Sequence, residues 1–598
     1  MSWPTYVARA TCRGARNAQS TPVLADAVSI RPMRVVCWLL LLACLAVPQV
    51  PASPRADTAC LPLTVTNDDG NYIVPGARSG VVYRRVDEQE LRLDFWVPST
   101  SPHQPRGSNR SVVAPVVIVI HGGGFTAGSR VTFVGQFLEL LAAAGYPWVS
   151  IDYRLGEPSR AANAADDVEA AVAFTRCHAG ELGIDPERIV LLGEDAGAGL
   201  AARIANRRPA GVVGAILIGG LYNGVPPQAE PPQEGPSRPP AAPRFLVVHG
   251  TADTEVPLRE AEAWCGPAVT DDARCKLLRV EGASHRAENW WPVQWDYKAQ
   301  VVRWLDDLAP AGRQDTLQPP PVDGATMLPA GLHKRLPYAQ QESSASPPSP
   351  HSGSTGPVLR TLDAWLPRDR SRPGPAVVLL HGGGWEAGDR VTYITPLFAP
   401  LAEAGLAWFS VDYRLTPAGH HPRQLDDLRQ AIAFIRRHAH QFGIDPARVV
   451  LVGESASAQM VTLVATEDRT LAGVVSFYGV YDFVPMVTDA EPRSLAARLF
   501  GRTVLDDDTG RILREYSPLH RAARGMPPIL LIHGTGERLW EQGVRMAERL
   551  GTLGVPHELI RLEGAPHGME NWEGRPEWQF YKARLVSWIQ QAAAHQRR

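Results

Sequence analysis

Short apolar runs rich in β-branched residues alternate along the chain with helix-length amphipathic segments. In the C-terminal half, the clearest apolar runs predict strands at residues 376–380, 407–411, 449–452, 473–477 and 529–532. Between two of these runs, residues 425–440 repeat their apolar positions every 3.6 residues, which predicts a helix. Continuously apolar strands separated by helices are typical of a mostly parallel sheet that is covered by helices.

The chain contains a long internal repeat. HGGGFTAGSRVT at residues 121–132 recurs 260 positions later as HGGGWEAGDRVT at residues 381–392. DYRL at residues 152–155 recurs at residues 412–415 with the same offset. A period of this length is a whole folding unit, so we expect two similar α/β domains in tandem, each with a mostly parallel central sheet flanked by helices.

The domain boundaries follow from this repeat. We expect an N-terminal extension with a signal peptide at residues 1–52, a first domain at residues 60–310 and a second domain at residues 357–596. Residues 311–356 between them are rich in proline and serine and are predicted to be a linker. Within this linker, residues 334–339 are a candidate first strand of the second domain.

The N-terminal region resembles an export signal. Residues 35–47 are continuously apolar, which is too short for a membrane span of about 20 residues but suits a signal-peptide core. Arg34 supplies the preceding positive charge, and Ala52 ends a small-residue cleavage site. A signal peptide around residues 33–52 predicts a secreted or periplasmic protein with no membrane span after cleavage. Translation is expected to begin at Met33, and a long natural leader at residues 1–32 is the competing interpretation. A lipid anchor at Cys44 is the less favoured alternative to secretion.

Cleavage would leave four cysteines, Cys60, Cys177, Cys265 and Cys275. An even number in an exported protein permits disulfides. Cys265 and Cys275 close a short loop and are the better candidate pair, whereas Cys177 is expected to be buried in an amphipathic helix. No C-x-x-C pair or histidine cluster in the sequence indicates a metal site, and no cofactor is implied.

Composition and charge exclude several classes of protein. The length of 598 residues requires two or more domains, and the apolar share of 44% excludes wholesale disorder. The 60 Lys and Arg residues balance 62 Asp and Glu residues, for a net charge of −2. The sequence therefore carries no electrostatic footprint for a nucleic-acid partner.

The second domain contains a candidate nucleophile. The predicted strand at residues 449–452 runs into Gly453-Glu-Ser455-Ala-Ser457, and a helix-forming stretch follows. Small residues on both sides of a serine at a strand-to-helix turn are what a nucleophile elbow requires, because larger side chains would clash in the strained turn. The amides at the start of the following helix can stabilise a developing oxyanion.

Other motifs of the second domain complete the chemistry. The glycine run that begins at His381 follows a strand and lets backbone N–H groups approach a substrate carbonyl. Glu537 follows the strand at residues 529–532, and His567 comes later in the chain. Along the chain, the serine Ser455 comes first, the acid Glu537 second and the histidine His567 third.

These motifs resemble the α/β-hydrolase superfamily, specifically its HGGG-bearing branch of secreted carbohydrate esterases (acetylxylan and feruloyl esterases) and hormone-sensitive-lipase-like carboxylesterases. The resemblance implies that Ser455 is the nucleophile, that His567 is the general base and then acid, and that Glu537 orients the imidazole. It also implies oxyanion-hole amides at Gly383, Gly384 and Ala456. The family usually has Asp at the position of Glu537, so Glu541 is a second candidate for the acid.

The first domain keeps this frame but lacks the nucleophile. Asp195 stands at the position of Ser455, whereas the equivalents of the acid, the base and the glycine run remain as Asp253, His285, Gly123 and Gly124. Two interpretations are open: an inactive copy, or an aspartate that attacks an sp³ carbon as in dehalogenases and epoxide hydrolases. The inactive copy is favoured, since residues 222–243 are too few to form the cap that residues 482–527 form in the second domain.

We therefore expect a secreted serine esterase that acts on small-molecule or polysaccharide-linked esters through an acyl-enzyme on Ser455. His249 and His533 lie at strand ends and are expected to be structural. The alternative from another class is a non-enzymatic tandem binding protein. Such a protein has no need of Ser455, Glu537 and His567 together.

Overall fold

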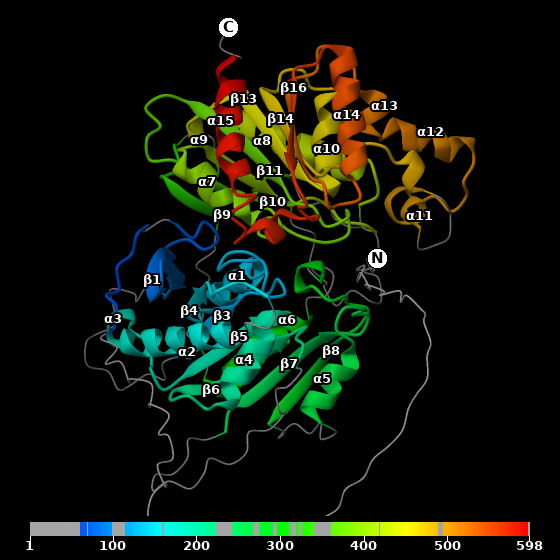
Figure 1. Ribbon diagram of the computed structural model, residues 1–598. Helices are drawn as coiled ribbons and strands as arrows, with labels where there is room; N and C mark the ends of the chain where they lie inside the picture. Colours follow the sequence, from blue (N-terminus) through cyan, green and yellow to red (C-terminus); the bar gives the residue numbers. More distant parts are fainter. Residues whose placement is uncertain are drawn as a thin grey trace, which may run out of the picture. The chain divides into compact units, whose positions relative to one another are not determined.

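Two eight-stranded sheets, each flanked by helices, organise the chain (Figure 1). The computed structural model describes residues 60–67, 70–98, 114–157, 161–222, 242–266, 274–290, 296–309, 311, 319–320, 322, 326–339, 360–417, 419–487 and 494–595. The predicted signal peptide lies outside these residues, as do residues 223–241 of the stretch predicted to be too short for a cap.

The first domain contains one sheet. Its strands are β1 (Arg78–Val86), β2 (Gln89–Trp96), β3 (Val116–Ile120), β4 (Trp148–Ile151), β5 (Ile189–Glu194), β6 (Val212–Ile218), β7 (Arg244–Gly250) and β8 (Cys275–Val280). Its helices are α1 (Gly135–Ala144), α2 (Ala161–Cys177), α3 (Ala179–Leu182), α4 (Ala196–Asn206), α5 (Leu258–Cys265), η2 (Ala287–Asn289) and α6 (Asp296–Leu308). The strand order is β1-β2-β4-β3-β5-β6-β7-β8, antiparallel at β1 and β2 and parallel from β4 to β8.

The second domain repeats this topology. Its strands are β9 (Gly331–Pro337), β10 (Thr361–Leu366), β11 (Gly374–Leu380), β12 (Ala407–Val411), β13 (Ile444–Glu454), β14 (Gly473–Phe477), β15 (Ile529–Gly534) and β16 (His557–Leu562). Its helices are η3 (Thr395–Leu397), α7 (Phe398–Glu403), α8 (Arg423–Arg437), α9 (Ala439–Phe442), α10 (Ala456–Ala465), η4 (Val484–Met486), α11 (Leu495–Phe500), α12 (Asp507–Glu515), α13 (Pro518–Arg521), α14 (Trp540–Leu553), η5 (Met569–Trp572) and α15 (Phe580–His595). The strand order is β16-β15-β14-β13-β11-β12-β10-β9.

The apolar runs are continuous because both faces of each sheet are buried. On β11, Val378 belongs to the buried cluster that includes residues of α8, α10 and α14. Val377 points to the other face and belongs to the cluster that includes residues of α7 and α15. The strands predicted for the second domain lie within β11 to β15, and the predicted helix corresponds to α8 followed by α9. The prediction of two tandem α/β-hydrolase domains is confirmed.

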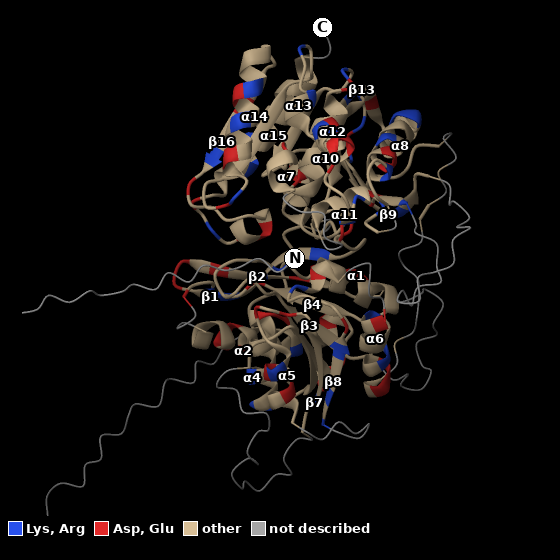
Figure 2. Cartoon of the chain, turned by 90° about the vertical axis from the view of Figure 1, so that its right-hand side faces the viewer, with Lys and Arg blue, Asp and Glu red and all other residues tan. Residues whose placement is uncertain are grey.

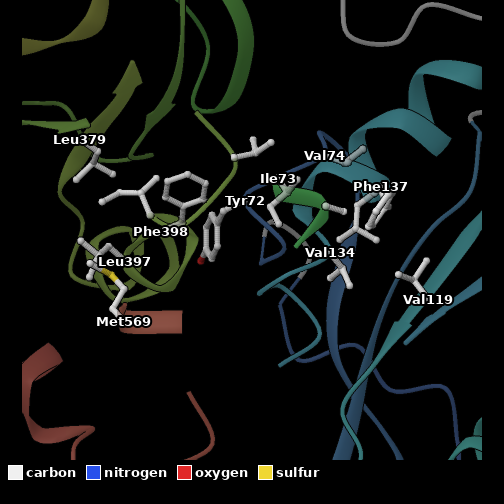
Figure 3. Close-up of a cluster of buried hydrophobic side chains, with 14 of the residues drawn as sticks. Tyr72, Ile73, Val74, Val119, Val134, Phe137, Leu379, Leu397, Phe398 and Met569 are labelled. Carbon is white, nitrogen blue, oxygen red and sulfur yellow. The ribbon is translucent and has the colours of Figure 1, made fainter. Parts of the chain in front are cut away.

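Residues 61–598 form one compact unit, in which the two domains share a hydrophobic cluster. From the first domain it includes Ile73 and Phe137, and from the second Leu397, Phe398 and Met569, all fully or almost fully buried (Figure 3). This cluster lies between the α1 and α6 face of one sheet and the α7 and α15 face of the other. The first domain therefore buries apolar surface of the second, whatever its own chemistry.

A buried ion-pair network also joins the domains. Arg390 donates to Asp363 at 2.8 Å and to Asp412 at 3.0 Å within the second domain. It donates as well to Glu139 on α1 of the first domain. Its repeat equivalent, Arg130, makes the corresponding pairs with Asp94 and Asp152 of its own domain. Because a buried charge needs a partner, this network ties α1 of the first domain to the second domain.

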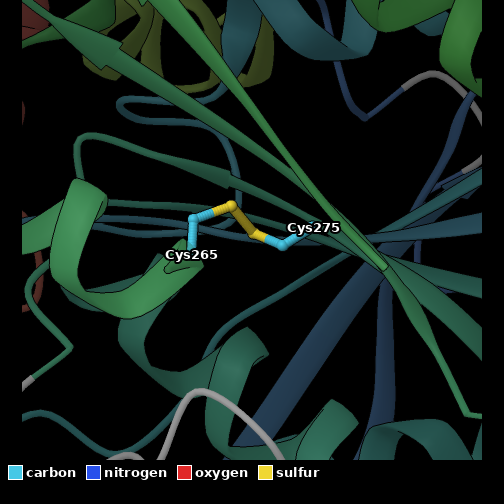
Figure 4. Close-up of a disulfide and its surroundings, with 2 residues drawn as sticks. All are labelled: Cys265 and Cys275. Carbon is cyan, nitrogen blue, oxygen red and sulfur yellow. A yellow bond between two sulfur atoms is a disulfide. The ribbon is translucent and has the colours of Figure 1, made fainter. Parts of the chain in front are cut away.

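A disulfide joins Cys265, the last residue of α5, to Cys275, the first residue of β8, with 5.5 Å between the Cα atoms (Figure 4). This is the predicted pair. The expectation that Cys177 is buried is wrong: it is exposed at the end of α2 and is itself disulfide-bonded. The buried positions of α2 include Val168, Ala171 and Thr175, and residue 177 falls off that stripe.

Charged residues of both signs are interspersed over the two domains (Figure 2). Within the described residues, no helix combines the length and the apolar character that crossing a bilayer would require.

Candidate active site

The strand-to-helix turn at Ser455 lies between β13 and α10. Ser455 has φ 55° and ψ −114°, a strained conformation for a residue with a side chain. A Cβ on Gly453 would lie 2.5 Å from the carbonyl oxygen of Ser457, so only glycine fits before the turn. The packing of the turn thus holds the Ser455 hydroxyl at the carboxyl edge of the sheet.

Ser457 replaces the second glycine of the usual elbow and is itself built into the turn. Its hydroxyl accepts a hydrogen bond from the amide of Glu454 at 2.9 Å and lies 2.8 Å from the carbonyl oxygen of Leu380. The same position in the first domain is Gly197, where a Cβ would lie 2.2 Å from the carbonyl oxygen of Ile120. The departure from the family pattern is therefore accommodated by hydrogen bonding to β11.

Ser455, His567 and Glu537 form one hydrogen-bonded series. The Ser455 Oγ lies 2.9 Å from His567 Nε2, and His567 Nδ1 lies 3.0 Å from Glu537 Oε2. These three residues follow β13, β16 and β15, whose carboxyl ends lie at the same edge of the sheet. Of the two candidate acids, Glu537 contacts the histidine, whereas Glu541 is exposed on α14.

Glu537 is buried and held on both carboxylate oxygens. His533 Nδ1 lies 3.1 Å from Oε1, and the amide of Leu539 donates to Oε2 at 3.0 Å. Burial alone would raise the pKa of Glu537, but the hydrogen bonds with His533 and His567 outweigh it and lower the pKa to about 2. The carboxylate is therefore ionised and oriented at every pH at which the protein would work.

The glycine loop after β11 adopts a conformation that only glycine takes readily. Gly383 and Gly384 have φ of 91° and 63°, and a Cβ on Gly383 would lie 2.2 Å from the carbonyl oxygen of Ala387. The equivalent glycines of the first domain have φ of 94° and 59°. The two loops therefore present their backbone amides in the same way.

Glu454 holds the glycine loop through its buried side chain. Its buried carboxylate accepts a hydrogen bond from the Gly382 amide. Burial, together with repulsion by Glu570, raises the pKa of Glu454 to about 8 despite that hydrogen bond. Tyr478 also interacts with Glu454, and its hydroxyl accepts a hydrogen bond from the amide of Met569 at 2.8 Å. The centre of its ring lies 4.7 Å from the centre of the His567 ring.

In the first domain, the Asp195 carboxylate lies at the position where an oxyanion would bind. Asp195 has φ 50° and ψ −115°, as Ser455 has, and its Oδ2 accepts hydrogen bonds from the amides of Gly123 at 3.0 Å and Gly124 at 2.9 Å. The two amides therefore converge on a single oxygen, the geometry that an oxyanion hole needs. In this domain the carboxylate of Asp195 occupies the place of the oxyanion.

His285 lies between two carboxylates. Its Nε2 is 3.5 Å from Asp195 Oδ1, and its Nδ1 is 2.9 Å from Asp253 Oδ2. Burial would lower the pKa of His285, but Asp195 and Asp253 raise it to about 10. At neutral pH the imidazole is therefore protonated and cannot accept a proton from water. His249 also contacts Asp253, at 3.2 Å, as His533 contacts Glu537.

The paired His285 makes the stability of the protein pH-dependent. Because its pKa is raised from 6.5 to about 10, its contribution to folding is fully present below about pH 6.5 and is lost as the pH rises through 10. We expect the free energy of unfolding, measured by urea titration, to fall more steeply from pH 7 to pH 10 in the wild type than in Asp195→Asn, which lacks one of the two carboxylates. Equal pH dependence of the two proteins would contradict the ion-pair assignment.

Most of the site residues predicted from the sequence converge in space, in both domains. The structure adds roles that the motifs did not reveal: His533 and His249 position the acids, and Glu454 supports the glycine loop. A sequence signal for the histidines did exist, since both stand in HGT exactly four residues before the acid of their domain. Such spacing places a strand-end histidine beside a carboxylate on the following loop.

One family model matches a segment in each half of the chain. The family described as BD-FAE matches residues 103–209 and residues 362–550. The two matched segments contain the glycine loop and the strand-to-helix turn of each domain, with Asp195 in the first and Ser455 in the second.

Esterase relatives agree with this match. The esterase LipC of Mycobacterium tuberculosis is 29% identical over 36% of this chain and 58% of its own length. The probable carboxylic ester hydrolase LipM of the same organism is 29% identical over 30% of this chain and 45% of its own length. The chain thus spans about half the length of these relatives. An acetyl ester-xyloside bifunctional hydrolase from Caldicellulosiruptor lactoaceticus is 21% identical over 44% of this chain and 97% of its own, with a TM-score of 0.37. On the family match and the relatives, this chain resembles the α/β-hydrolase carboxylesterases in both of its domains.

Proposed function

We propose that this protein hydrolyses carboxylic esters through an acyl-enzyme formed on Ser455 of the second domain. The observation that carries the proposal is the continuous series from Ser455 through His567 to Glu537, with distances of 2.9 and 3.0 Å. A nucleophile, a base within hydrogen-bond reach and a buried acid that orients the base are the parts that acyl transfer requires. A protein that only binds a ligand needs none of these contacts.

The chemistry follows from the positions of these groups. Ser455 Oγ attacks the acyl carbon while its proton passes to His567 Nε2, and Glu537 stabilises the resulting imidazolium. The oxyanion binds to the amides of Gly383, Gly384 and Ala456. The alcohol leaves with the proton of His567, and a water molecule, deprotonated by the same imidazole, then releases the acid and restores Ser455.

We assign no hydrolytic activity to the first domain. Asp195 has no hydroxyl, its carboxylate fills the amide pair of Gly123 and Gly124, and His285 is protonated. An aspartate nucleophile would need a neutral histidine to activate the water that cleaves its ester. The raised pKa of His285 counts against that alternative.

The second domain has a cap that fits a water-excluding site. It consists of α11, α12 and α13 and is tied to the loop of the oxyanion hole. Arg498 on α11 forms an ion pair with Glu386, two residues after Gly384. The ring centres of Trp385 and Phe483 lie 5.4 Å apart. Exclusion of water by such a cap strengthens the electrostatic interactions in the site beneath.

We assign the substrate to short acyl or hydroxycinnamoyl esters, carried by a polysaccharide or by a small alcohol. The names of the relatives, an esterase and a probable carboxylic ester hydrolase, support a carboxylic ester as the substrate. Export through the signal segment at residues 33–52 fits the same assignment, since a polymeric substrate lies outside the cell. The Cys265–Cys275 disulfide is also typical of an oxidising compartment.

A labelling experiment and a substrate comparison test the proposal. We expect the purified chain to hydrolyse p-nitrophenyl acetate and to be inactivated by a fluorophosphonate, with the adduct found by mass spectrometry on the peptide that contains Ser455. Release of acetate or ferulate from substituted xylan would support the polysaccharide assignment, and activity on small esters alone would reject it. A chain that neither turns over the small ester nor is labelled at Ser455 would refute the proposed function.

A further inference from the structure

The loops that follow His285 and His567 contact each other across the two domains. Arg286, the residue after His285, reaches the second domain with both terminal nitrogens of its guanidinium. One lies 3.3 Å from Glu570 Oε1, and the other donates to Asn571 Oδ1 at 3.2 Å. The Asn571 amide in turn donates to the backbone carbonyl of His567 at 2.8 Å. A series of two hydrogen bonds thus runs from the first domain to the backbone of the candidate base.

Arg286 is fixed at this place by its surroundings. Its guanidinium lies 5.2 Å from the centre of the Phe133 ring, which favours a cation there. The carboxylates of Glu570 and Glu288 are buried. Burial and repulsion between glutamates raise the pKa of Glu288, whereas Arg286 acts to lower the pKa of both carboxyl groups. Removal of the guanidinium would leave these acids without its positive charge.

The second domain cannot supply this contact itself. Aligning the two histidines places Gly568 at the position of Arg286. Gly568 has φ 94°, and a Cβ there would lie 2.3 Å from Glu570 Oε1. The corresponding asparagine of the first domain, Asn289, also differs in its partner, since it accepts a hydrogen bond from Tyr393 of the second domain at 2.6 Å. The inactive copy thus offers a side chain that the active copy lacks.

We propose that Arg286 is a positioning residue for the ester hydrolysis carried out by the second domain. It holds Asn571, and through Asn571 it fixes the His567 loop so that the imidazole stays in line between Ser455 and Glu537. This inference rests on the proposed function. It gives the first domain a positioning role in the reaction of the second, in addition to the apolar surface that it buries.

A double-mutant cycle on the full chain tests this proposal. We expect Arg286→Met and Asn571→Ala each to lower kcat for p-nitrophenyl acetate about 10- to 100-fold, since a misplaced reacting group costs a rate of this order. KM should change little, because neither side chain is placed at the substrate. The double variant should be no slower than the slower single variant, since both act through one contact. Arg286→Lys, which can replace only one of the two hydrogen bonds, should have an intermediate kcat.

The matched control is Arg279→Met, which removes an arginine from an exposed ion pair with Glu262 in the same domain. Its kcat should equal that of the wild type. If Arg286→Met and Asn571→Ala fold with the circular dichroism spectrum of the wild type and keep its kcat, or if their losses multiply in the double variant, the proposal is wrong. If Arg286→Met does not fold, Arg286→Lys and Asn571→Ala decide alone. Hydrolysis by the wild type in the same assay shows separately that the proposed function stands.

Discussion

Replacing Ser455 by alanine is expected to lower kcat/KM for p-nitrophenyl acetate by at least about 10⁴-fold. The variant keeps His567, Glu537 and the amides of the oxyanion hole, but it has no oxygen that can form the acyl-enzyme. What activity remains would come from binding and from stabilisation of the oxyanion during direct attack by water. The measurement is the steady-state rate with the labelling yield of the fluorophosphonate, and both should fall together.

Asp195→Asn is the matched control for this substitution, because it changes the equivalent residue of the other domain. We expect it to leave the esterase rate unchanged, since Asp195 is not part of the proposed reaction. Full activity in Ser455→Ala would refute the assignment of the nucleophile. A loss in Asp195→Asn comparable to that in Ser455→Ala would show that the first domain takes part in the chemistry.

The fold could be predicted well because its signals are local. The apolar run at residues 376–380 of β11 is buried on both faces, and this burial is what makes the strand recognisable. The boundaries of α8 were less predictable. Its apolar period continues to His440, but the helix ends at Arg437 and His438 turns its ring back onto the carbonyl oxygen of Phe434. The apolar period therefore does not mark the residue at which α8 ends.

The candidate site could be predicted where a backbone requirement restricts the residue type. Gly453 and Gly383 are recognisable because a Cβ at either position would collide with a backbone carbonyl. The choice between Glu537 and Glu541 could not be made from the sequence, since the two lie only one helical turn apart. The folded structure distinguishes them: Glu537 contacts His567, whereas Glu541 is exposed to solvent.

The contacts between the two domains could not be predicted from the sequence. The repeat predicts two similar domains, but nothing in their motifs indicates that Arg286 would meet Asn571 or that Arg390 would pair with Glu139. The place of Asp195 in the oxyanion hole was equally hidden. The substitution shows that a hydroxyl is missing, and only the folded chain shows that the carboxylate accepts hydrogen bonds from the two glycine amides.

Replacing Glu537 by glutamine is expected to lower kcat by about 10⁴-fold, which is the order found when the acid of such a triad becomes an amide. Glutamine has the size of glutamate, but it carries no charge to stabilise the imidazolium, and its NH₂ group can face a histidine only as a donor. His567 would then be held in the wrong tautomer for accepting the Ser455 proton. Because the pKa of Glu537 is about 2, the wild type should not lose activity through this residue above about pH 4, so the difference should persist over the whole working range.

Glu541→Gln is the control, since it makes the same chemical change one helical turn away at an exposed position. Its kcat should match that of the wild type, and circular dichroism should show that both variants are folded. If instead Glu541→Gln lost the activity and Glu537→Gln kept it, the acid would lie on α14. His567 would then have to leave its 3.0 Å contact with Glu537 during the reaction. The opposite result would place the acid in the loop after β15, where His533 and the Leu539 amide already hold its carboxylate in a single orientation.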